Sequence, residues 1–465
     1  MKTNTNLDPR VDYLVNPFNN LINKKKFSDV RKTMHIFRGV TGQGKTYTCI
    51  HDWIPRLLEK NVRLIVYSVP FNEIRQDDEF ETAAAKYGAN VVYNFHKAQR
   101  FLKNKNGNPV ILIVTNQNWT GEKGKNFQKW VVSNIESIPI AFILDEAHTW
   151  TVSCQPNYRA VTGNNTPSYE AILFKQLSKL SRVTPYMFGM TATPNAEMIG
   201  TVLTATGMTF EIVNEMADKS LLISKTAWLN TIEHYKRGAE QYAFENFTSK
   251  FLGKVSDDKP VMMIHVCREP NLWNVENTLA HLKSYLKLVD AAIDTDEKTI
   301  VVLTDKRKFI TDLDGNEERV NDEKALDYLR DPEHPARFLI VVEKGKCGMN
   351  VSNLASYFSF RFVDRKDMEG TFIITNFLQT AGRFVRPNAS YALDSNNDLT
   401  SYVLSIKNNA EYTDSQKKRI LDELISVNSF DICVPDTETW RESMTIFSRD
   451  YCSSVIDARW WVDVV

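Results

Sequence analysis

The chain has 465 residues, of which 43% are hydrophobic and 25% are charged. This composition is typical of a globular protein and excludes a fibrous or disordered one. Lys and Arg together number 57, as do Asp and Glu, which excludes a protein that coats nucleic acid through excess positive charge. Because there is no overall positive charge, a nucleic-acid site would be a local groove. The length is sufficient for two or three domains.

The cysteines and the N-terminus indicate a cellular compartment. The six cysteines are scattered singly, without a C-x-x-C pair, which predicts a reduced protein without structural zinc. Residues 1–10 lack the apolar core of a signal peptide, and no stretch approaches the roughly 18 apolar residues that span a bilayer. We therefore expect a soluble intracellular protein without a membrane partner, either cytoplasmic or nucleoid-associated.

Short β-branched runs alternate with amphipathic stretches from about Met34 onward, which predicts parallel strands joined by helical crossovers. Several runs are almost wholly apolar, as strands covered on both faces should be. The strands predicted in the first half are Met34–Phe37, Arg63–Ser68, Asn90–Tyr93, Val110–Thr115, Ile138–Leu144 and Tyr186–Met190. The helices predicted between these strands include Lys45–Glu59 and Ser168–Leu180.

A second series of the same kind begins near Lys259. Its predicted elements are strand Val261–Val266, helix Asn274–Leu288, and strands Thr299–Leu303, Arg337–Val342 and Ala355–Phe362. The predicted fold class is therefore α/β, with two tandem parallel-sheet domains. We place them at residues 34–213 and 214–390, after an N-terminal extension, 1–33, and before a helix-rich C-terminal tail, 391–465.

One segment carries a complete phosphate-binding pattern. Gly39-Val40-Thr41-Gly42-Gln43-Gly44-Lys45-Thr46 matches G-x-x-x-x-G-K-[ST] and lies between a predicted strand and a predicted helix. Glycines allow consecutive N–H groups to surround phosphate oxygens, and the helix N-terminus adds a favourable potential for anions. We predict that Lys45 neutralises the β- and γ-phosphates of ATP and that the Thr46 hydroxyl binds Mg²⁺.

Two carboxylates follow the predicted strand Ile138–Leu144 directly, in the segment Asp145-Glu146-Ala147-His148. At the carboxyl end of a strand they should face the same crevice as the phosphate loop. We predict that Asp145 holds the hydrated Mg²⁺ and that Glu146 orients and deprotonates the attacking water. Burying two adjacent acids without a cation is costly, so the pair itself argues for a metal.

Together, these two segments resemble the superfamily-two helicases and translocases of the DEAH type, and the resemblance spans roughly residues 34–388. It implies RecA-like domains with a nucleotide cleft between them, and ATP and Mg²⁺ as cofactors. Thr191-Ala192-Thr193-Pro194 matches the family's S/T-A-T motif. The resemblance implies that His148, Thr191 and Thr193 couple hydrolysis to domain movement.

In the second half, residues 379–386 match the family pattern Q-x-x-G-R-x-x-R. Arg383 and Arg386 are three residues apart, so on a helix they share one face. The resemblance implies that both arginines contact the γ-phosphate in the transition state, and that Gln379 is a further catalytic residue.

Residues 345–351 are similar to the family segment that senses the nucleotide, which makes Gly348 and Asn350 nucleotide-binding candidates. The family often has Asp where this chain has Asn350, so a charge is missing there. Residues 11–32 contain no glutamine, and we therefore find no glutamine-centred adenine-recognition motif. Low nucleobase selectivity is expected.

The resemblance also indicates where nucleic acid binds. The candidate contacts are Pro70, Thr115 and, in the second domain, His265. Residues 337–362 and 379–386 are most similar in style to restriction-enzyme translocases and excision-repair helicases, which favours DNA over RNA. The resemblance therefore implies an ATP-dependent helicase or translocase that acts on DNA. An RNA helicase with the same core and a noncatalytic nucleic-acid clamp remain as alternatives. The C-terminal tail is a candidate site for protein partners, and the sequence does not give the oligomeric state.

The dipeptide Asp314-Gly315 predicts a hairpin within residues 306–320. The basic and aromatic residues of this hairpin allow two interpretations. It either separates nucleic-acid strands as a wedge or is a plain surface hairpin.

Overall fold

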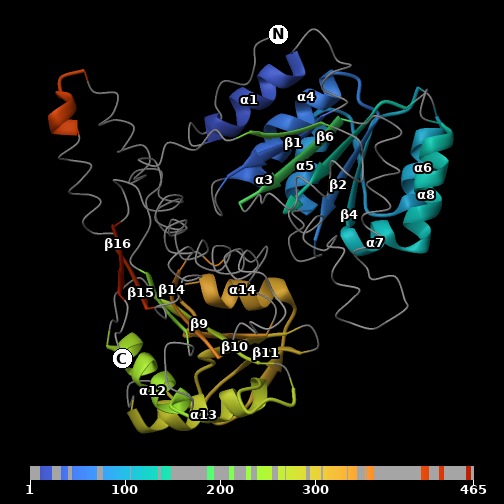
Figure 1. The fold of residues 1–465 in the computed structure, drawn as a ribbon. Helices are drawn as coiled ribbons and strands as arrows, with labels where there is room; N and C mark the ends of the chain where they lie inside the picture. Colours follow the sequence, from blue (N-terminus) through green and yellow to red (C-terminus); the bar gives the residue numbers. More distant parts are fainter. Residues whose placement is uncertain are drawn as a thin grey trace, which may run out of the picture. The chain divides into compact units, whose positions relative to one another are not determined.

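A computed structural model of the chain divides into two compact units, residues 1–218 and 219–465, which are described separately (Figure 1). The predicted boundaries of the individual domains stay predictions. The structure describes residues 11–23, 33–39, 44–70, 77–104, 106–134, 138–147, 186–192, 209–213, 227–231, 238–253, 260–267, 269–289, 294–304, 307–331, 333–342, 351, 353–360, 410–417, 429–433 and 457–461.

The first unit is built on a seven-stranded parallel sheet with the order β3-β4-β2-β5-β6-β1-β7. Its strands are β1 (Thr33–Arg38), β2 (Leu64–Val69), β3 (Asn90–Val92), β4 (Val110–Thr115), β5 (Ile140–Leu144), β6 (Tyr186–Thr191) and β7 (Thr209–Val213). The predicted strand Val110–Thr115 coincides with β4. Because all strands are parallel, the segments that follow β1, β2, β4, β5 and β6 leave the sheet at the same edge.

Helices cover both faces of the first sheet. They are α1 (Asp12–Asn23), α3 (Lys45–Thr48), α4 (Ile54–Glu59), α5 (Asp77–Lys86), α6 (Phe95–Lys103), α7 (Asn116–Thr120) and α8 (Glu122–Ser133), with a π-helical turn, η2 (Cys49–Trp53). Ile36 packs with Ala98 of α6 and Phe127 of α8 in one core. On the opposite face, Phe18 of α1 stacks on Trp53 with ring centroids 4.7 Å apart. Figure 1 shows α6 and α8 side by side.

The predicted helix Lys45–Glu59 is one helical segment formed by α3, η2 and α4. Pro55 lies in the first turn of α4. Proline has no N–H, and its ring clashes with the carbonyl four residues earlier in a regular α-helix. The wider π turn immediately before α4 is the kind of irregularity that accommodates such a residue.

The second unit contains a nine-stranded sheet with the order β12-β11-β10-β13-β9-β14-β8-β15-β16. Its strands are β8 (Ala227–Thr231), β9 (Val261–His265), β10 (Ile300–Leu303), β11 (Lys308–Thr311), β12 (Glu317–Arg319), β13 (Phe338–Val341), β14 (Leu354–Ser359), β15 (Ser429–Cys433) and β16 (Asp457–Trp461). Neighbouring strands are parallel except for the pairs β10–β11 and β11–β12. Strands β11 and β12 form the predicted hairpin. Gly315 in the turn has a φ of 101°, where glycine is favoured.

Three helices pack on the second sheet: α12 (Glu240–Leu252), α13 (Val275–Val289) and α14 (Asp322–Arg330). Figure 1 shows α12 and α13 on one face and α14 on the other. Phe244 of α12 and Leu282 of α13 share a core with Ile264 of β9. Within the described ranges, no helix is both long and apolar enough to cross a bilayer.

Two helical features predicted from the sequence, one in the C-terminal tail and one in the first domain, stay predictions. The tail contributes β15 and β16 to the second sheet, while its helix-rich character stays a prediction. The predicted helix Ser168–Leu180 lies outside the described residues.

Candidate nucleotide site

The ends of the phosphate loop are described, whereas residues 40–43 lie outside the described part. Gly39 follows β1 and donates its N–H to the carbonyl of Thr191 at 3.1 Å. Gly44 precedes α3 with a φ of 74°, in the left-handed region that favours glycine. The Lys45 ammonium donates to the Gly39 carbonyl at 2.7 Å, which places the lysine at the start of the loop where phosphate is expected.

Asp145 and Glu146 follow β5, as predicted. The Asp145 side chain is buried, and Glu146 is half-buried. Glu146 has a φ of 49°, an unusual value for a residue other than glycine. Such a conformation costs on the order of 1 to 3 kcal/mol, and strained residues of this kind gather at functional sites. This conformation makes Glu146 a candidate functional residue.

The Asp145 carboxylate is held by three donors. Tyr67 donates its hydroxyl to Oδ2 at 2.7 Å, and the Thr46 hydroxyl lies 3.4 Å from the same oxygen. The backbone N–H of Glu146 donates to Oδ1 at 3.0 Å. Thr46 of the phosphate-loop helix and Asp145 of the acidic segment are therefore neighbours, although 99 positions separate them in the chain.

Burial and the charge of Glu146 shift the titration of this carboxyl. Burial, followed by the Glu146 charge, raises the pKa of Asp145 to about 6, against the lowering effects of the Tyr67 hydrogen bond and the Lys45 charge. Burial also raises the pKa of Tyr67, and the negative charge of Asp145 raises it further. The tyrosine consequently keeps its proton and acts as the donor in the bond to Asp145.

The donor set fits Mg²⁺, a hard cation that prefers oxygen ligands and is commonly held by one or two protein groups together with substrate phosphates. Asp145 and Thr46 offer a carboxylate and a hydroxyl that lie together. A nearby cation would also offset the cost of burying the carboxylate. Across the described residues, no cluster of three or more His, Cys, Asp and Glu is found.

Thr191 ends β6, which lies in the sheet between the strand of the phosphate loop and the strand of the acids. Thr191 is fully buried, and its register partner in β1 is Arg38. Its carbonyl accepts the Gly39 N–H, which joins the S/T-A-T segment directly to the phosphate loop. The two other predicted coupling residues, His148 and Thr193, lie outside the described residues.

The predicted nucleic-acid contacts lie at the ends of their strands, as expected, but all three are buried. Pro70 follows β2. Thr115 ends β4, and its hydroxyl accepts the Asn118 N–H at 3.1 Å. His265 ends β9 and uses Nδ1 toward the Tyr357 hydroxyl at 3.0 Å and Nε2 toward the Val342 carbonyl. These internal partners give the Thr115 and His265 side chains structural roles, and contacts of all three residues with nucleic acid stay predictions.

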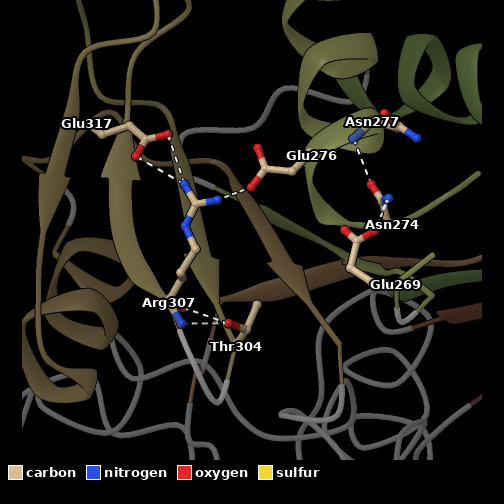
Figure 2. Close-up of polar contacts among 7 residues, drawn as sticks. All are labelled: Glu269, Asn274, Glu276, Asn277, Thr304, Arg307 and Glu317. Carbon is tan, nitrogen blue, oxygen red and sulfur yellow. Dashed lines mark hydrogen bonds and ion pairs between the residues drawn. The ribbon is translucent and has the colours of Figure 1, made fainter. Parts of the chain in front are cut away.

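The hairpin of the second unit uses its basic residues internally. Figure 2 shows Arg307 with Glu276 of α13 and Glu317 of β12. Lys308 pairs with Asp322, and Phe309 is buried in the core. The described residues of this segment therefore favour a surface hairpin over a wedge.

The remaining predicted site residues of the second unit lie outside the described residues. They are Gly348, Asn350, Gln379, Arg383 and Arg386. Their roles stay predictions.

Two tyrosines at the site were not predicted from the sequence. Tyr67 bonds to Asp145, as described above, and Tyr13 of α1 lies against Gly39. A Cβ atom added to Gly39 would lie 2.4 Å from the Tyr13 hydroxyl oxygen, so a larger residue at this position would displace the Tyr13 side chain. The sequence contained one indication of Tyr67: it lies in the predicted strand Arg63–Ser68, shortly before the predicted nucleic-acid contact Pro70.

Residues 13–196 match the family model described as "Type III restriction enzyme, res subunit". The chain is also similar to the solved structure of the helicase MrfA bound to DNA and AMPPNP, with 13% identity and a TM-score of 0.50. That match covers 82% of this chain and 49% of the other, so this chain spans about half the length of that relative. No curated protein sequence matches the chain.

Two further solved structures are similar at lower scores. The DEAD-box helicase Mss116 bound to ssRNA has 12% identity and a TM-score of 0.48, over 97% of this chain and 96% of the other. A fragment of an HsdR subunit of a type I restriction enzyme from Vibrio vulnificus has 13% identity and a TM-score of 0.46, over 83% and 65%.

Proposed function

We propose that the chain is an ATP-hydrolysing motor of the superfamily-two helicase and translocase type, which moves along nucleic acid or separates its strands. The match of residues 13–196 to a restriction-enzyme res-subunit model and the similarity in fold to the helicase MrfA support this proposal. The observation that carries this proposal is the meeting of Thr46 with Asp145 at 3.4 Å, beside the buried Lys45. These are the groups that a phosphate loop and an acidic strand end contribute to nucleotide hydrolysis.

Each site residue of the first unit has a proposed role toward the nucleotide. Lys45 and the loop that begins at Gly39 bind the phosphates, and Asp145 and Thr46 hold Mg²⁺. Glu146 accepts the proton of the attacking water. When bound, Mg²⁺ neutralises charge on the β- and γ-phosphates.

We also propose that three residues of the second unit stabilise the γ-phosphate in the transition state, namely Arg383, Arg386 and Gln379. Arginine is suited to this role because its charge is permanent and it can bind phosphate oxygens in a bidentate fashion.

DNA is the proposed track. The matching family model is described as a subunit of a restriction enzyme, a class that acts on DNA, and MrfA was solved with DNA bound. A net charge of 0 implies that grip on DNA comes from a local surface rather than from the field of the whole protein.

The test is ATP turnover with single-stranded DNA, duplex DNA, forked DNA and RNA of matched sequence, followed by strand displacement on the best activator. We expect DNA to stimulate turnover severalfold more than RNA. Stronger stimulation by RNA would identify an RNA helicase instead. Tight nucleic-acid binding without turnover would identify a noncatalytic clamp.

A further inference from the structure

Tyr67 lies where strand β2 meets the acidic segment. The register of β2 and β5 places Tyr67 opposite Ile143. Side chains alternate along a strand, so Tyr67 and Asp145 project from the same face of the sheet. The Tyr67 hydroxyl reaches along that face to Asp145 Oδ2 at 2.7 Å.

The tyrosine ring is fixed by its surroundings. Tyr67 is fully buried, and its ring packs against Phe80 of α5 with centroids 4.8 Å apart. A buried tyrosine hydroxyl needs a polar partner, and in this case the partner is a carboxylate. The packing therefore directs the hydroxyl at one oxygen of Asp145.

The hydroxyl completes a set of bonds that fixes the plane of the carboxylate. Oδ1 receives the Glu146 N–H, and Oδ2 receives Tyr67 and, at the longer distance of 3.4 Å, Thr46. If Thr46 binds metal, Tyr67 is the donor that remains on Oδ2. Residues that orient a metal ligand commonly tune affinity for the metal about 10- to 100-fold.

We propose that Tyr67 is a positioning residue that orients the Asp145 carboxylate for Mg²⁺ through its buried hydroxyl. This inference rests on the proposed function, because it assigns Asp145 to a metal bound with the nucleotide. It adds a residue of β2 to the metal site.

The test compares Tyr67→Phe with the wild type in full-length protein. This change removes one oxygen and keeps the ring that packs on Phe80. The affinity for a fluorescent, non-hydrolysable ATP analogue is measured in EDTA and in saturating Mg²⁺, and the ratio of the two affinities is the readout. We expect Tyr67→Phe to bind the analogue in EDTA as tightly as the wild type does. We expect its Mg²⁺ enhancement to be about tenfold smaller, because the substitution removes a hydrogen bond to a charged group.

Two variants calibrate the result. Asp145→Asn should abolish most of the Mg²⁺ enhancement. Tyr285→Phe removes a hydroxyl that donates to the Glu245 carbonyl at 2.9 Å in the second unit, and it should leave the enhancement unchanged.

The outcomes separate the two claims. A wild-type protein without Mg²⁺-enhanced binding would overturn the proposed function and this inference with it. A wild-type enhancement that Tyr67→Phe retains in full would overturn the role of Tyr67 alone, even if the variant unfolds at a lower temperature. An equal loss of affinity in EDTA and in Mg²⁺ would also contradict it, because the hydroxyl would then support the fold of the site rather than the metal ligand.

Discussion

At the scale of single residues, the candidate site is a buried carboxylate surrounded by donors. Lys45, Thr46, Asp145 and Glu146 were predictable because local patterns encode them: a phosphate loop before a helix, and two acids after an apolar strand. Tyr67 and Tyr13 were not predictable, because their contacts depend on strand register and on how α1 packs against β1. Local sequence patterns therefore predict the proposed nucleotide-binding groups better than they predict the tyrosines that contact those groups.

The raised pKa of Asp145 has a consequence for stability. An Asp whose pKa is about 6 in the folded state, against 3.8 in the unfolded state, binds its proton more tightly when folded. The free energy of unfolding should therefore fall as pH rises from about 4 to about 6, and level off above that range.

We predict that Asp145→Asn, in metal-free buffer without nucleotide, raises the free energy of unfolding at pH 8 by about 1 to 3 kcal/mol. The gain should shrink toward pH 4, where the wild-type carboxyl is protonated. Denaturant unfolding at both pH values measures the difference. A gain that is the same at pH 4 and pH 8 would show that the Asp145 charge is not the cause.

At the scale of elements, the parallel strands were predictable because strands covered on both faces are nearly continuous apolar runs. Strand β7 was not predicted, since Glu211 interrupts its run. In the structure, the Glu211 carboxylate lies 3.0 Å from Nδ1 of His35 on neighbouring β1. A polar residue that finds its partner across a sheet cannot be recognised from one strand alone.

Strand β6 shows how tightly the elements of the site are packed. A Cβ atom added to Gly189 would lie 2.3 Å from Ile36 Cδ1 and 2.9 Å from Ala147 Cβ. Glycine at this position lets β6 lie close to β1 and to the turn that carries the acids.

We predict that Gly189→Ala lowers the free energy of unfolding by about 1 to 3 kcal/mol through overpacking. Ile36→Val removes the nearer clashing atom, so the double variant should recover part of the loss, as a double-mutant cycle measures. Gly253→Ala is the control, because its added Cβ would meet only ordinary contacts at 3.6 Å. Additive effects of Gly189→Ala and Ile36→Val would contradict the packing explanation.

At the scale of the whole molecule, the two α/β series read from the sequence correspond to two sheets in two compact units. The second sheet also contains strands that the sequence did not indicate, namely β8 and, from the tail, β15 and β16. Strand β8 pairs with β14, β15 pairs with β8, and β16 pairs with β15. Pairing between distant segments, rather than a local sequence pattern, therefore determines where these strands lie.

We propose that the loop ending in Lys45 binds ATP for hydrolysis. Phosphate release from wild-type and Lys45→Ala protein, at saturating Mg²⁺, ATP and stimulating nucleic acid, measures this role. The control is Lys97→Ala, at an exposed position of α6. We predict that Lys45→Ala lowers turnover at least about 100-fold, because the substitution removes a positive charge that stabilises the transferring phosphate. Lys97→Ala should match the wild type. Wild-type turnover by Lys45→Ala would show that this loop does not bind ATP for hydrolysis.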